Sequence, residues 1–370
     1  MPPVKTVLSV FGTRPEAIKM APVLKALARE PDIRSLVCVT AQHRQMLDQV
    51  LGLFGIVPDH DLDLMREGQT LTEITTGALS RLEPYLAEVK PDFLLVQGDT
   101  TTTMAASLAA FYRKIPVGHV EAGLRTHDNF YPYPEEVNRR ITSVIASRHF
   151  APTPRARENL LREGVPQGGI VVTGNTVIDA LLEVVAMKPP RVPELPLRGK
   201  RLVLLTAHRR ENFGEPMQEI FAAVRDLVGR YADLDVVYPV HPNPSVAGPA
   251  REALGGTAGV HLTEPLEYKA FCDLMAASFL ILTDSGGIQE EAPSLKKPVL
   301  VLRDETERPE AVDAGVVRLV GPHREKIVTE VERLIADPKA YAAMATGANP
   351  YGDGKAAERI VAILKNAIRG

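Results

Sequence analysis

The chain has 370 residues, of which 45% are hydrophobic and 24% charged, and its formal net charge is −3. This is the composition of an ordinary globular protein with room for two domains, and it excludes a disordered or fibrous chain. There is no basic excess to neutralise a nucleic-acid backbone, so an anionic ligand has to be met by a few placed cations. We therefore expect no nucleic-acid partner.

Two cysteines, Cys38 and Cys272, lie far apart, one in an apolar run and one in an expected helix. They predict buried thiols in a reducing compartment rather than a disulfide or a metal pair. The apolar run within Met1–Phe11 leads directly into a turn and has no cleavage site, and no later stretch is long enough to span a bilayer. We expect a cytoplasmic protein with no membrane contact.

Short β-branched runs alternate with amphipathic stretches along the first half of the chain. The runs are almost continuously apolar, which is typical of strands in a parallel sheet covered on both faces. The expected strands are Val4–Phe11, Leu36–Thr40, Phe93–Gln97, Pro116–Glu121, His149–Pro152 and Ile170–Thr173. The expected helices between them are Ala17–Arg29, Gln45–Phe54, Thr72–Val89, Thr101–Arg113, Glu136–Ala146 and Pro154–Glu163. This repetition predicts a doubly wound α/β sheet.

A proline-rich segment interrupts the pattern at residues 187–200 and predicts a stiff linker. The alternation then restarts, with expected strands at Leu202–Thr206, Val236–Val240, Phe279–Thr283, Val299–Leu302 and Val316–Val320 and a last helix at Ala356–Ile368. We therefore expect a first domain over residues 1–186, the linker, a second domain over 201–354 and a C-terminal helix over 355–370. Two such domains place a ligand between them, at the carboxyl ends of their strands.

A pair of cations follows the first expected strand. The strand ends in the segment Gly12–Glu16, and the helix after it carries Lys19. Pro15 suits a first helical turn, so Arg14 and Lys19 are expected near a helix N-terminus, where they suit a phosphate group. The alternative is a surface Arg and Lys that pair with Glu16.

The second domain carries a sharper motif. The strand Phe279–Thr283 runs into Asp284–Gly287, and a helix is expected to begin near Ile288 with Glu290 and Glu291 close behind. Small residues let a diphosphate approach the free N–H groups at the start of a helix. A carboxylate one turn further on is placed to accept hydrogen bonds from ribose hydroxyls. The alternative is a tight turn in which the two glutamates only favour the helix N-terminus.

Two common nucleotide-binding motifs, G-x-G-x-x-G and G-x-x-x-x-G-K-[ST], follow none of the expected strands. Their absence predicts that the protein uses neither NAD nor a P-loop. Among nine His and two Cys there is no close ligand spacing, so we also expect no metal.

Acidic residues stand at strand ends on one edge of the first domain. Asp99 and Glu121 each follow a buried strand, while Glu135 and Glu136 open a helix. Partial burial raises the pKa of a carboxyl group, which suits acid/base catalysis. Each has a structural alternative: Asp99 as a helix cap, Glu121 as the partner of Arg125, and Glu135 at a helix dipole. Their convergence on one edge favours catalysis.

A histidine follows the first strand of the second domain. His208 stands there beside Arg209 and Arg210, and His241 follows the next strand. A histidine at a strand's carboxyl end beside two arginines favours a phosphate donor or an acid/base group over a purely structural role.

Taken in order, these motifs resemble the non-hydrolysing UDP-N-acetylglucosamine 2-epimerase family. The segments that carry the resemblance span nearly the whole chain: FGTRPEAIKMAP, TAQHRQML, QGDTTTTMA, HVEAGLRT, PYPEEVNRR, TGNTVIDAL, TAHRRENFG, YPVHPNP, LTDSGGIQEEAPSL and RDETERPEAVDAG. The resemblance implies two Rossmann-like doubly wound domains that face a cleft, as in GT-B glycosyltransferases. It also implies a homodimer, and a C-terminal helix that crosses back to the first domain.

The resemblance further implies a reaction that inverts C2 of UDP-N-acetylglucosamine without NAD and supplies UDP-N-acetylmannosamine for surface polysaccharide. UDP leaves C1, which makes the C2 hydrogen removable and yields a glycal. UDP then adds back while a proton returns to C2 from the opposite face. Two faces need two acid/base groups, and the implied candidates are Asp99, Glu121 and Glu135, assisted by His208.

Binding residues are implied in the same way. UDP is expected at Arg14, Lys19, His208, Phe271, Ser285, Gly286, Gly287, Glu291 and Arg308, with Phe271 near uracil and Glu291 at the ribose. A second, activating substrate molecule is expected at Gln42, His43, Gln45, Glu135, Arg209 and His241. One departure concerns this activator site: several members carry Arg where this chain has Gly68, and Arg66 stands two residues before it.

Three other functions stay open at this point. A glycosyltransferase of the same fold needs an acceptor before it forms product. A hydrolysing epimerase releases free N-acetylmannosamine and UDP. A nucleotide-sugar sensor binds without turnover, which the three carboxylates disfavour.

Overall fold

The first unit of the chain is built on a seven-stranded parallel sheet with the order β3-β2-β1-β4-β5-β6-β7. The structure is a computed structural model that describes residues 4–40, 44–64, 66, 68–190, 192, 194–198 and 201–369. The strands are β1 (Lys5–Phe11), β2 (Ile33–Val39), β3 (His60–Asp61), β4 (Phe93–Gln97), β5 (Val117–Val120), β6 (Arg148–Ala151) and β7 (Ile170–Val172). The six expected strands are confirmed to within three residues, whereas the two-residue β3 was not expected.

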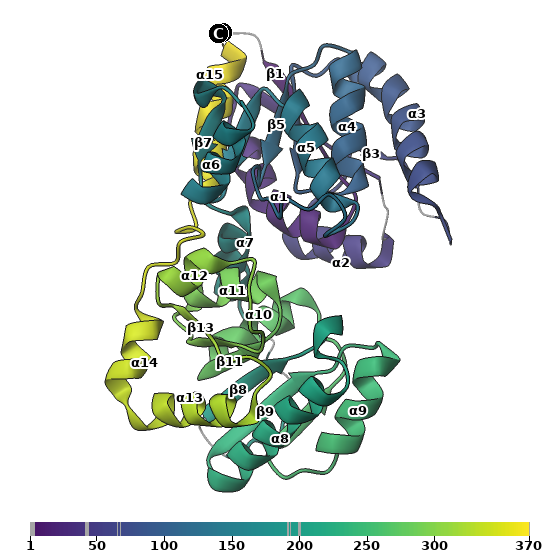
Figure 1. Cartoon of the computed structure of the whole chain (residues 1–370). Coiled ribbons are helices and arrows are strands. Elements are labelled where there is room, and N and C mark those ends of the chain that lie inside the picture. The colour runs from purple at the N-terminus through teal and green to yellow at the C-terminus, as the bar shows by residue number, and fades with distance from the viewer. Residues whose placement is uncertain are drawn as a thin grey trace. The chain divides into compact units, whose positions relative to one another are not determined.

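Helices alternate with these strands (Figure 1). They are α1 (Arg14–Ala28), α2 (Arg44–Phe54), α3 (Leu71–Val89), α4 (Thr101–Tyr112), α5 (Glu135–Ile145), α6 (Pro154–Arg162) and α7 (Thr176–Ala186), with a 3-10 turn, η1, at Gln167–Gly169. Helix α1 begins three residues earlier than expected because the Glu16 carboxylate accepts the backbone N–H of Thr13, 2.7 Å away, and so caps the first turn. From β1 the strand order runs through β2 to β3 on one side and from β4 to β7 on the other. The order therefore reverses between β1 and β4, and ligands of such sheets bind at this point.

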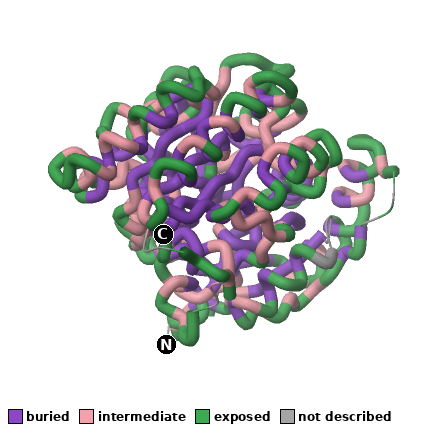
Figure 2. Tube along the Cα trace, turned by 90° about the horizontal axis from the view of Figure 1, so that it is seen from below, coloured by how far each residue is buried: buried purple, intermediate pink, exposed green. Residues whose placement is uncertain are grey.

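The second unit repeats this plan with a six-stranded parallel sheet in the order β10-β9-β8-β11-β12-β13. Its strands are β8 (Arg201–Thr206), β9 (Leu234–Pro239), β10 (Val260–Thr263), β11 (Leu280–Thr283), β12 (Val299–Val301) and β13 (Val317–Leu319). Its helices are η2 (Arg210–Asn212), α8 (Glu215–Arg230), α9 (Pro244–Leu254), α10 (Tyr268–Ala277), α11 (Gly286–Glu291), η3 (Ala292–Leu295), α12 (Pro309–Asp313), α13 (Arg324–Ala336) and α14 (Pro338–Ala345). The central strands β8, β9, β11 and β12 are mostly buried, whereas β10 is only partly buried and the helices expose their outer turns (Figure 2). Strand β10 was not expected.

The two units are residues 1–180 with 351–370, and residues 181–350. The last helix, α15 (Ala356–Arg369), belongs to the first unit and packs against α1. Its N-terminus is capped by Asp179, whose carboxylate accepts the N–H groups of Ala356 (3.2 Å) and Ala357 (2.8 Å). The first unit is therefore discontinuous in sequence. Of the helices that the structure describes, none is long and apolar enough to cross a bilayer.

Helix α5 packs with its polar face inward. Its buried residues are polar: Glu136, Asn138, Thr142 and Ser143. Three of its apolar residues lie outside, with exposed fractions of 36% for Val137, 37% for Ile141 and 87% for Val144, while Ile145 at its end packs against the core. A surface helix normally buries its apolar stripe, so this inversion indicates that the inner face of α5 serves a polar network.

Two buried histidines lie side by side under this helix. His119 of β5 and His149 of β6 are partners in register, and their Nε2 atoms lie 2.7 Å and 3.0 Å from the carbonyl oxygens of Gly98 and Ser143. Burial lowers the pKa of His119 to about 3 and also lowers the pKa of His149. Both rings are therefore neutral in the folded protein at neutral pH.

This burial predicts a loss of stability in mild acid. In the unfolded chain His119 has the ordinary histidine pKa of 6.5, so it binds a proton below that pH. In the folded chain it binds a proton only below about pH 3. The free energy of unfolding is therefore expected to fall as the pH drops from 6.5 towards 3, by about 1 kcal/mol per pH unit from this residue. The free energy of unfolding, measured by urea titration at pH 7, 6 and 5, should fall less for His119→Gln than for the wild type. The same dependence on pH in both proteins would contradict the prediction.

Candidate active site

Glu121 lies at the carboxyl end of β5 and is held by three donors. Its backbone adopts a left-handed conformation (φ 65°), which is uncommon for a residue other than glycine. Its buried carboxylate accepts Lys19 Nζ at 2.5 Å and Asn175 Nδ2 at 2.9 Å on Oε1, and Gln97 Nε2 on Oε2. The donors come from α1, β4 and the segment before α7, so three elements fix one carboxylate.

The alternative in which Glu121 pairs with Arg125 is wrong. Arg125 donates to Glu163 instead, from Nε at 2.8 Å and Nη2 at 2.7 Å, and its guanidinium is fully buried. Lys19, expected on the diphosphate side, forms an ion pair with Glu121, which is expected to act as an acid or base. The two residues, predicted to have separate roles, are therefore direct neighbours.

Glu16 is likewise not a surface partner of Arg14 and Lys19. Its buried carboxylate accepts the N–H groups of Gly12 (2.9 Å) and Thr13 (2.7 Å) and the hydroxyl of Thr100 (2.6 Å). Burial raises the pKa of Glu16, and it outweighs the hydrogen bonds, which lower the pKa. The residue ties the turn after β1 to the start of α4, which leaves Arg14 half-buried at the carboxyl end of the sheet.

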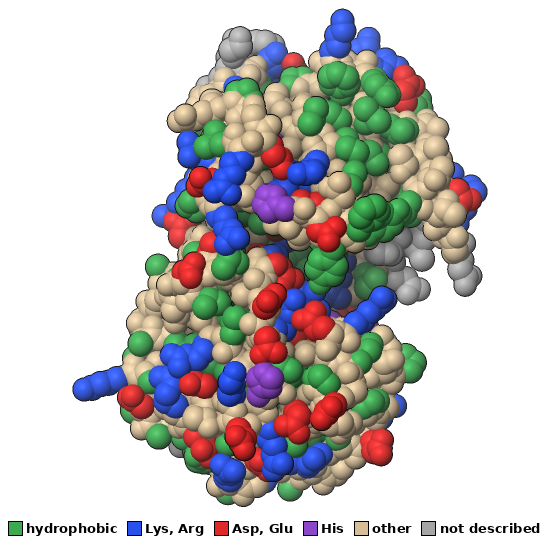
Figure 3. All heavy atoms as spheres, in the orientation of Figure 1, with side chains coloured by type: hydrophobic (Ala, Val, Ile, Leu, Met, Phe, Trp, Pro, Cys, Tyr) green, Lys and Arg blue, Asp and Glu red, His purple; other side chains and the backbone are tan. Residues whose placement is uncertain are grey.

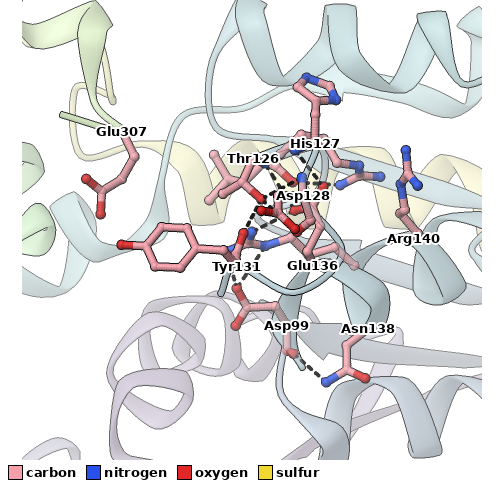
Figure 4. Close-up of polar contacts among 12 residues, drawn as sticks. Asp99, Thr126, His127, Asp128, Tyr131, Glu136, Asn138, Arg140 and Glu307 are labelled. Atoms are coloured by element: carbon pink, nitrogen blue, oxygen red, sulfur yellow. Dashed lines mark hydrogen bonds and ion pairs between the residues drawn. The ribbon is translucent and has the colours of Figure 1, made fainter. Parts of the chain in front are cut away.

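Asp99 follows β4 and pairs with Arg139 of α5. The guanidinium donates to its Oδ2 from Nε (2.9 Å) and Nη2 (2.6 Å), and Asn138 Nδ2 donates to the Asp99 carbonyl at 3.0 Å, as Figure 4 shows for Asn138. Asp99 does not cap α4, because the side chain of Thr100 accepts the Thr103 N–H. The structural alternative for Asp99 is therefore wrong.

The structure places Glu121 next to Gly98, the residue before Asp99. A Cβ atom on Gly98 would lie 3.7 Å from Glu121 Oε2. Glu135 is the first residue of α5, and its Oε2 is a buried oxygen with no hydrogen-bond partner among the described residues. All three predicted carboxylates of the first unit thus lie on segments that follow β4 or β5.

In the second unit, a buried aspartate organises the loop after β8. Asp284 Oδ2 accepts the N–H groups of His208 (2.7 Å) and Arg209 (2.8 Å) and the amide of Asn212 (3.2 Å), and Oδ1 lies 3.3 Å from His208 Nδ1. The sequence indicates Asp284 only as part of a small-residue turn. A buried acidic residue at the end of an apolar strand is the signal that could have identified it.

His208 is exposed on one side and packs on another histidine. Its ring stacks on His241 with 5.5 Å between ring centroids. Burial lowers the pKa of His208, while the charge of Asp284 opposes this shift. The neutral ring is therefore favoured, with its Nδ1 turned towards Asp284.

The Gly286–Gly287 turn opens α11 two residues before the expected start at Ile288, because Gly286 already adopts the helical conformation behind Ser285. A Cβ atom on Gly286 would lie 3.6 Å from Arg209 Nη2 and 4.0 Å from Arg308 Cζ. Glu307 Oε1, which accepts from Arg209, would lie 3.8 Å from the same Cβ atom. Two guanidinium groups and one carboxylate therefore flank the first N–H groups of α11, and the two cations suit a diphosphate.

The carboxylates after this turn have different partners. Glu290 is buried and pairs with Arg308, whereas Glu291 accepts the hydroxyl of Tyr268 at 3.3 Å. Tyr268 and Phe271 lie three residues apart on α10, hence on one side of that helix. Tyr268, for which no sequence signal was used, thus holds Glu291, and it shares one side of α10 with the half-buried Phe271.

The residues expected at the activator site are only partly described. Gln42 and His43 lie outside the described residues, as does the side chain of Gln45. Arg209 donates to Glu307 at 3.1 Å, and His241 stacks on His208. Gly68 has a φ of 72°, a left-handed conformation that glycine adopts without strain, so the departure at this position has a backbone reason.

Two Rossmann-like units, with clustered carboxylates in one and a cation-flanked glycine turn in the other, define the two-domain α/β class to which GT-B-like nucleotide-sugar enzymes belong. The chain matches the UDP-N-acetylglucosamine 2-epimerase profile over residues 25–365. It belongs to the UDP-N-acetylglucosamine 2-epimerase family, a family of isomerases.

Individual relatives agree with this assignment. The chain is 57% identical over 374 residues to the UDP-N-acetylglucosamine 2-epimerase of Escherichia coli K12, covering 97% of this chain and 98% of that one. A crystal structure of the Neisseria meningitidis UDP-GlcNAc 2-epimerase bound to UDP-GlcNAc is 52% identical, with a TM-score of 0.86 and coverage of 98% and 100%. The Methanocaldococcus jannaschii enzyme in complex with UDP-GlcNAc and UDP is 35% identical, with a TM-score of 0.77 and coverage of 98% and 99%.

Proposed function

We propose that this protein interconverts UDP-N-acetylglucosamine and UDP-N-acetylmannosamine by inverting C2, without hydrolysis and without NAD. Family membership and the UDP-GlcNAc-bound relative support the substrate. The turn after β1 supports the absence of NAD, since it has Thr13, Arg14 and Pro15 where a dinucleotide-binding turn has glycines. The product is a precursor for surface polysaccharide, made in the cytoplasm, and the buried free thiols of Cys38 and Cys272 suit that compartment.

In this proposal the second unit holds UDP. The N–H groups of Gly286 and Gly287 and the Arg308 guanidinium bind the diphosphate, with the Ser285 hydroxyl and His208 as further donors, because the Ser285 N–H itself donates to Thr283 Oγ1 at 2.9 Å. Glu291, positioned by Tyr268, accepts the ribose hydroxyls, and Phe271 lies by uracil. In the first unit, Arg14 and Lys19 are the cations proposed for phosphate oxygens, and Lys19 also balances the charge of Glu121. Holding UDP after it leaves C1 matters because its escape would strand the glycal.

Carboxylates of the first unit carry the proton transfers. As UDP leaves, positive charge develops at C1 and makes the C2 hydrogen acidic enough for a carboxylate to remove. A second acid then returns a proton to the other face before UDP re-adds. The observation that carries this proposal is the position of Glu121, fixed by Lys19, Gln97 and Asn175 next to the Asp99 segment.

The deciding experiment is NMR of UDP-N-acetylglucosamine with the purified protein in deuterated water, without nicotinamide or acceptor. A UDP-N-acetylmannosamine signal with deuterium at C2 supports the proposal. Product that forms only with an added sugar acceptor supports a glycosyltransferase. Free N-acetylmannosamine with UDP supports a hydrolysing epimerase, and binding without turnover supports a sensor.

We also propose that the protein is a homodimer that pairs through α5. Helix α4 packs beside α5, and its end exposes Phe111 and Tyr112, which are 58% and 69% exposed and line one surface hollow with Ile145 of α5. Figure 3 shows hydrophobic side chains gathered over these two helices. An apolar surface of this kind, formed by a helix that buries its polar side and exposes its apolar side, is typical of a protein–protein interface.

A lysine at the most exposed position of this surface tests the dimer. Val144→Lys is expected to convert a dimer into a monomer, because two-fold pairing brings the same charge to the interface twice and buries it. Light scattering after size-exclusion chromatography measures the mass. Val57→Lys, a change at an equally exposed valine outside the patch, should leave the mass unchanged. A Val144→Lys protein with the wild-type dimer mass would contradict the proposed interface.

A further inference from the structure

Glu136 is a completely buried carboxylate that joins a loop to the candidate site. Its oxygens accept the backbone N–H groups of Thr126 and His127, each at 3.1 Å, and Arg139 Nη1 at 3.0 Å (Figure 4). The loop it holds is residues 126–134, where Thr126 also donates to the Tyr131 carbonyl. Phe130, Tyr131 and Tyr133 expose their rings from this loop.

Arg139 connects Glu136 to Asp99. Its Nε and Nη2 donate to Asp99 while its Nη1 donates to Glu136, so one planar guanidinium bridges two carboxylates. The Arg139 side chain is only 14% exposed. A lysine has the same charge but lacks the fixed fork of donors, so it cannot reproduce both contacts at once.

We propose that Glu136 is a positioning residue for the reaction: through Arg139 it sets the orientation of the Asp99 carboxylate, and through Thr126 and His127 it fixes the aromatic loop beside it. This inference rests on the proposed function, in which Asp99 acts on the sugar. A proton transfer needs its donor and acceptor atoms within hydrogen-bond reach, and a displacement of about 1 Å costs about 100-fold in rate. Glu136 itself touches no reacting atom in this proposal.

Glu136→Gln tests the proposal. The amide has nearly the same shape but loses the charge that holds Arg139, and its NH2 group opposes the donors around it. We expect kcat to fall about 100-fold, with KM and the Kd for UDP within threefold of the wild type. Asp179→Asn is the matched control: Asp179 also accepts two successive backbone N–H groups, but at the start of α15. It should lower the melting temperature and leave kcat unchanged.

Arg139→Lys separates positioning of Asp99 from anchoring of the loop, because it leaves the bonds from Glu136 to Thr126 and His127 in place. We expect a similar loss of kcat, and a double variant no worse than the poorer single one, since both changes break one chain of contacts. Wild-type kcat in Arg139→Lys, or multiplied losses in the double variant, would overturn the proposal. If Glu136→Gln does not fold, the Arg139→Lys result decides.

The two proposals fail in different ways. Absence of C2 deuteration with the wild-type protein would refute the epimerase function itself. Normal wild-type turnover together with wild-type kcat in Glu136→Gln would refute only the positioning role.

Discussion

Glu121→Gln is expected to lower kcat about 1000-fold, within the range that a lost acid/base group costs. Glutamine keeps the size of the side chain and the left-handed backbone, but it cannot exchange a proton. It also turns an NH2 group towards Lys19, Gln97 or Asn175, all of which donate to the native carboxylate. Initial rates of UDP-N-acetylmannosamine formation measure kcat, and calorimetry should give a Kd for UDP within threefold of the wild type.

Glu30→Gln is the matched control for this change. Glu30 pairs with Lys365 in the same unit, just as Glu121 pairs with Lys19, but it lies two residues after the C-terminal end of α1. Its loss should leave kcat unchanged. A Glu121→Gln enzyme that turns over at more than a tenth of the wild-type rate would remove Glu121 from the proton transfers.

Asp284→Asn is expected to weaken UDP binding about 100-fold and to lower the free energy of unfolding by about 3 kcal/mol. Hydrogen bonds to a charged group each contribute about 1.5–3 kcal/mol, and this buried carboxylate accepts three of them from His208, Arg209 and Asn212. Without the charge, the loop that carries His208 and Arg209 loses its anchor beside the Gly286 turn. Calorimetry with UDP and urea unfolding measure the two effects.

Asp235→Asn separates these two effects. Asp235 is equally buried in the same unit and accepts the Arg198 N–H (2.7 Å) and His261 Nε2 (2.9 Å), but near the start of β9, at the opposite edge of the sheet. It should destabilise the protein without changing the affinity for UDP. Equal affinities for UDP in the wild type and Asp284→Asn would show that the loop after β8 does not contribute to binding.

Most of the fold could be predicted because its signal is local. Continuous apolar runs such as Phe93–Gln97 can be buried only in a sheet covered on both faces, and alternation with helices dictates parallel strands. The strands that were missed are weak on the same criterion. β3 has two residues, His60 and Asp61, and no residue of β10 is fully buried. Neither strand carries an apolar run that marks a sheet interior.

The site could be predicted residue by residue but not contact by contact. Asp99 and Glu121 could be proposed because each follows a strand, and Glu135 because it opens a helix, and these positions meet at one edge of a parallel sheet. Their partners could not be, because Lys19 and Glu121 are 102 positions apart, and Arg139 and Asp99 are 40 apart. Nothing local in the sequence distinguishes a lysine that meets phosphate from one that meets a carboxylate.

Helix α5 shows where hydrophobic periodicity gives the wrong face. Its apolar positions, Val137, Ile141 and Val144, predict the side that packs on the sheet, yet the structure exposes them. The sheet beneath presents polar groups, including the neutral rings of His119 and His149, and these require hydrogen-bonding partners. Burial of Glu136 and Asn138 answers that need, so the polar environment overrides the usual preference of the helix.

The discontinuity of the first unit constrains the order in which a ribosome can deliver it. α15, whose residues Ile360 and Leu364 are fully buried, is translated only after the whole segment Leu181–Pro350 has been synthesised. At about 5–20 residues per second, the N-terminal sheet waits roughly 10–35 s for the helix that covers α1. The second unit is thus synthesised completely before the first unit is. Throughout that interval the nascent chain exposes the α1 surface to chaperones.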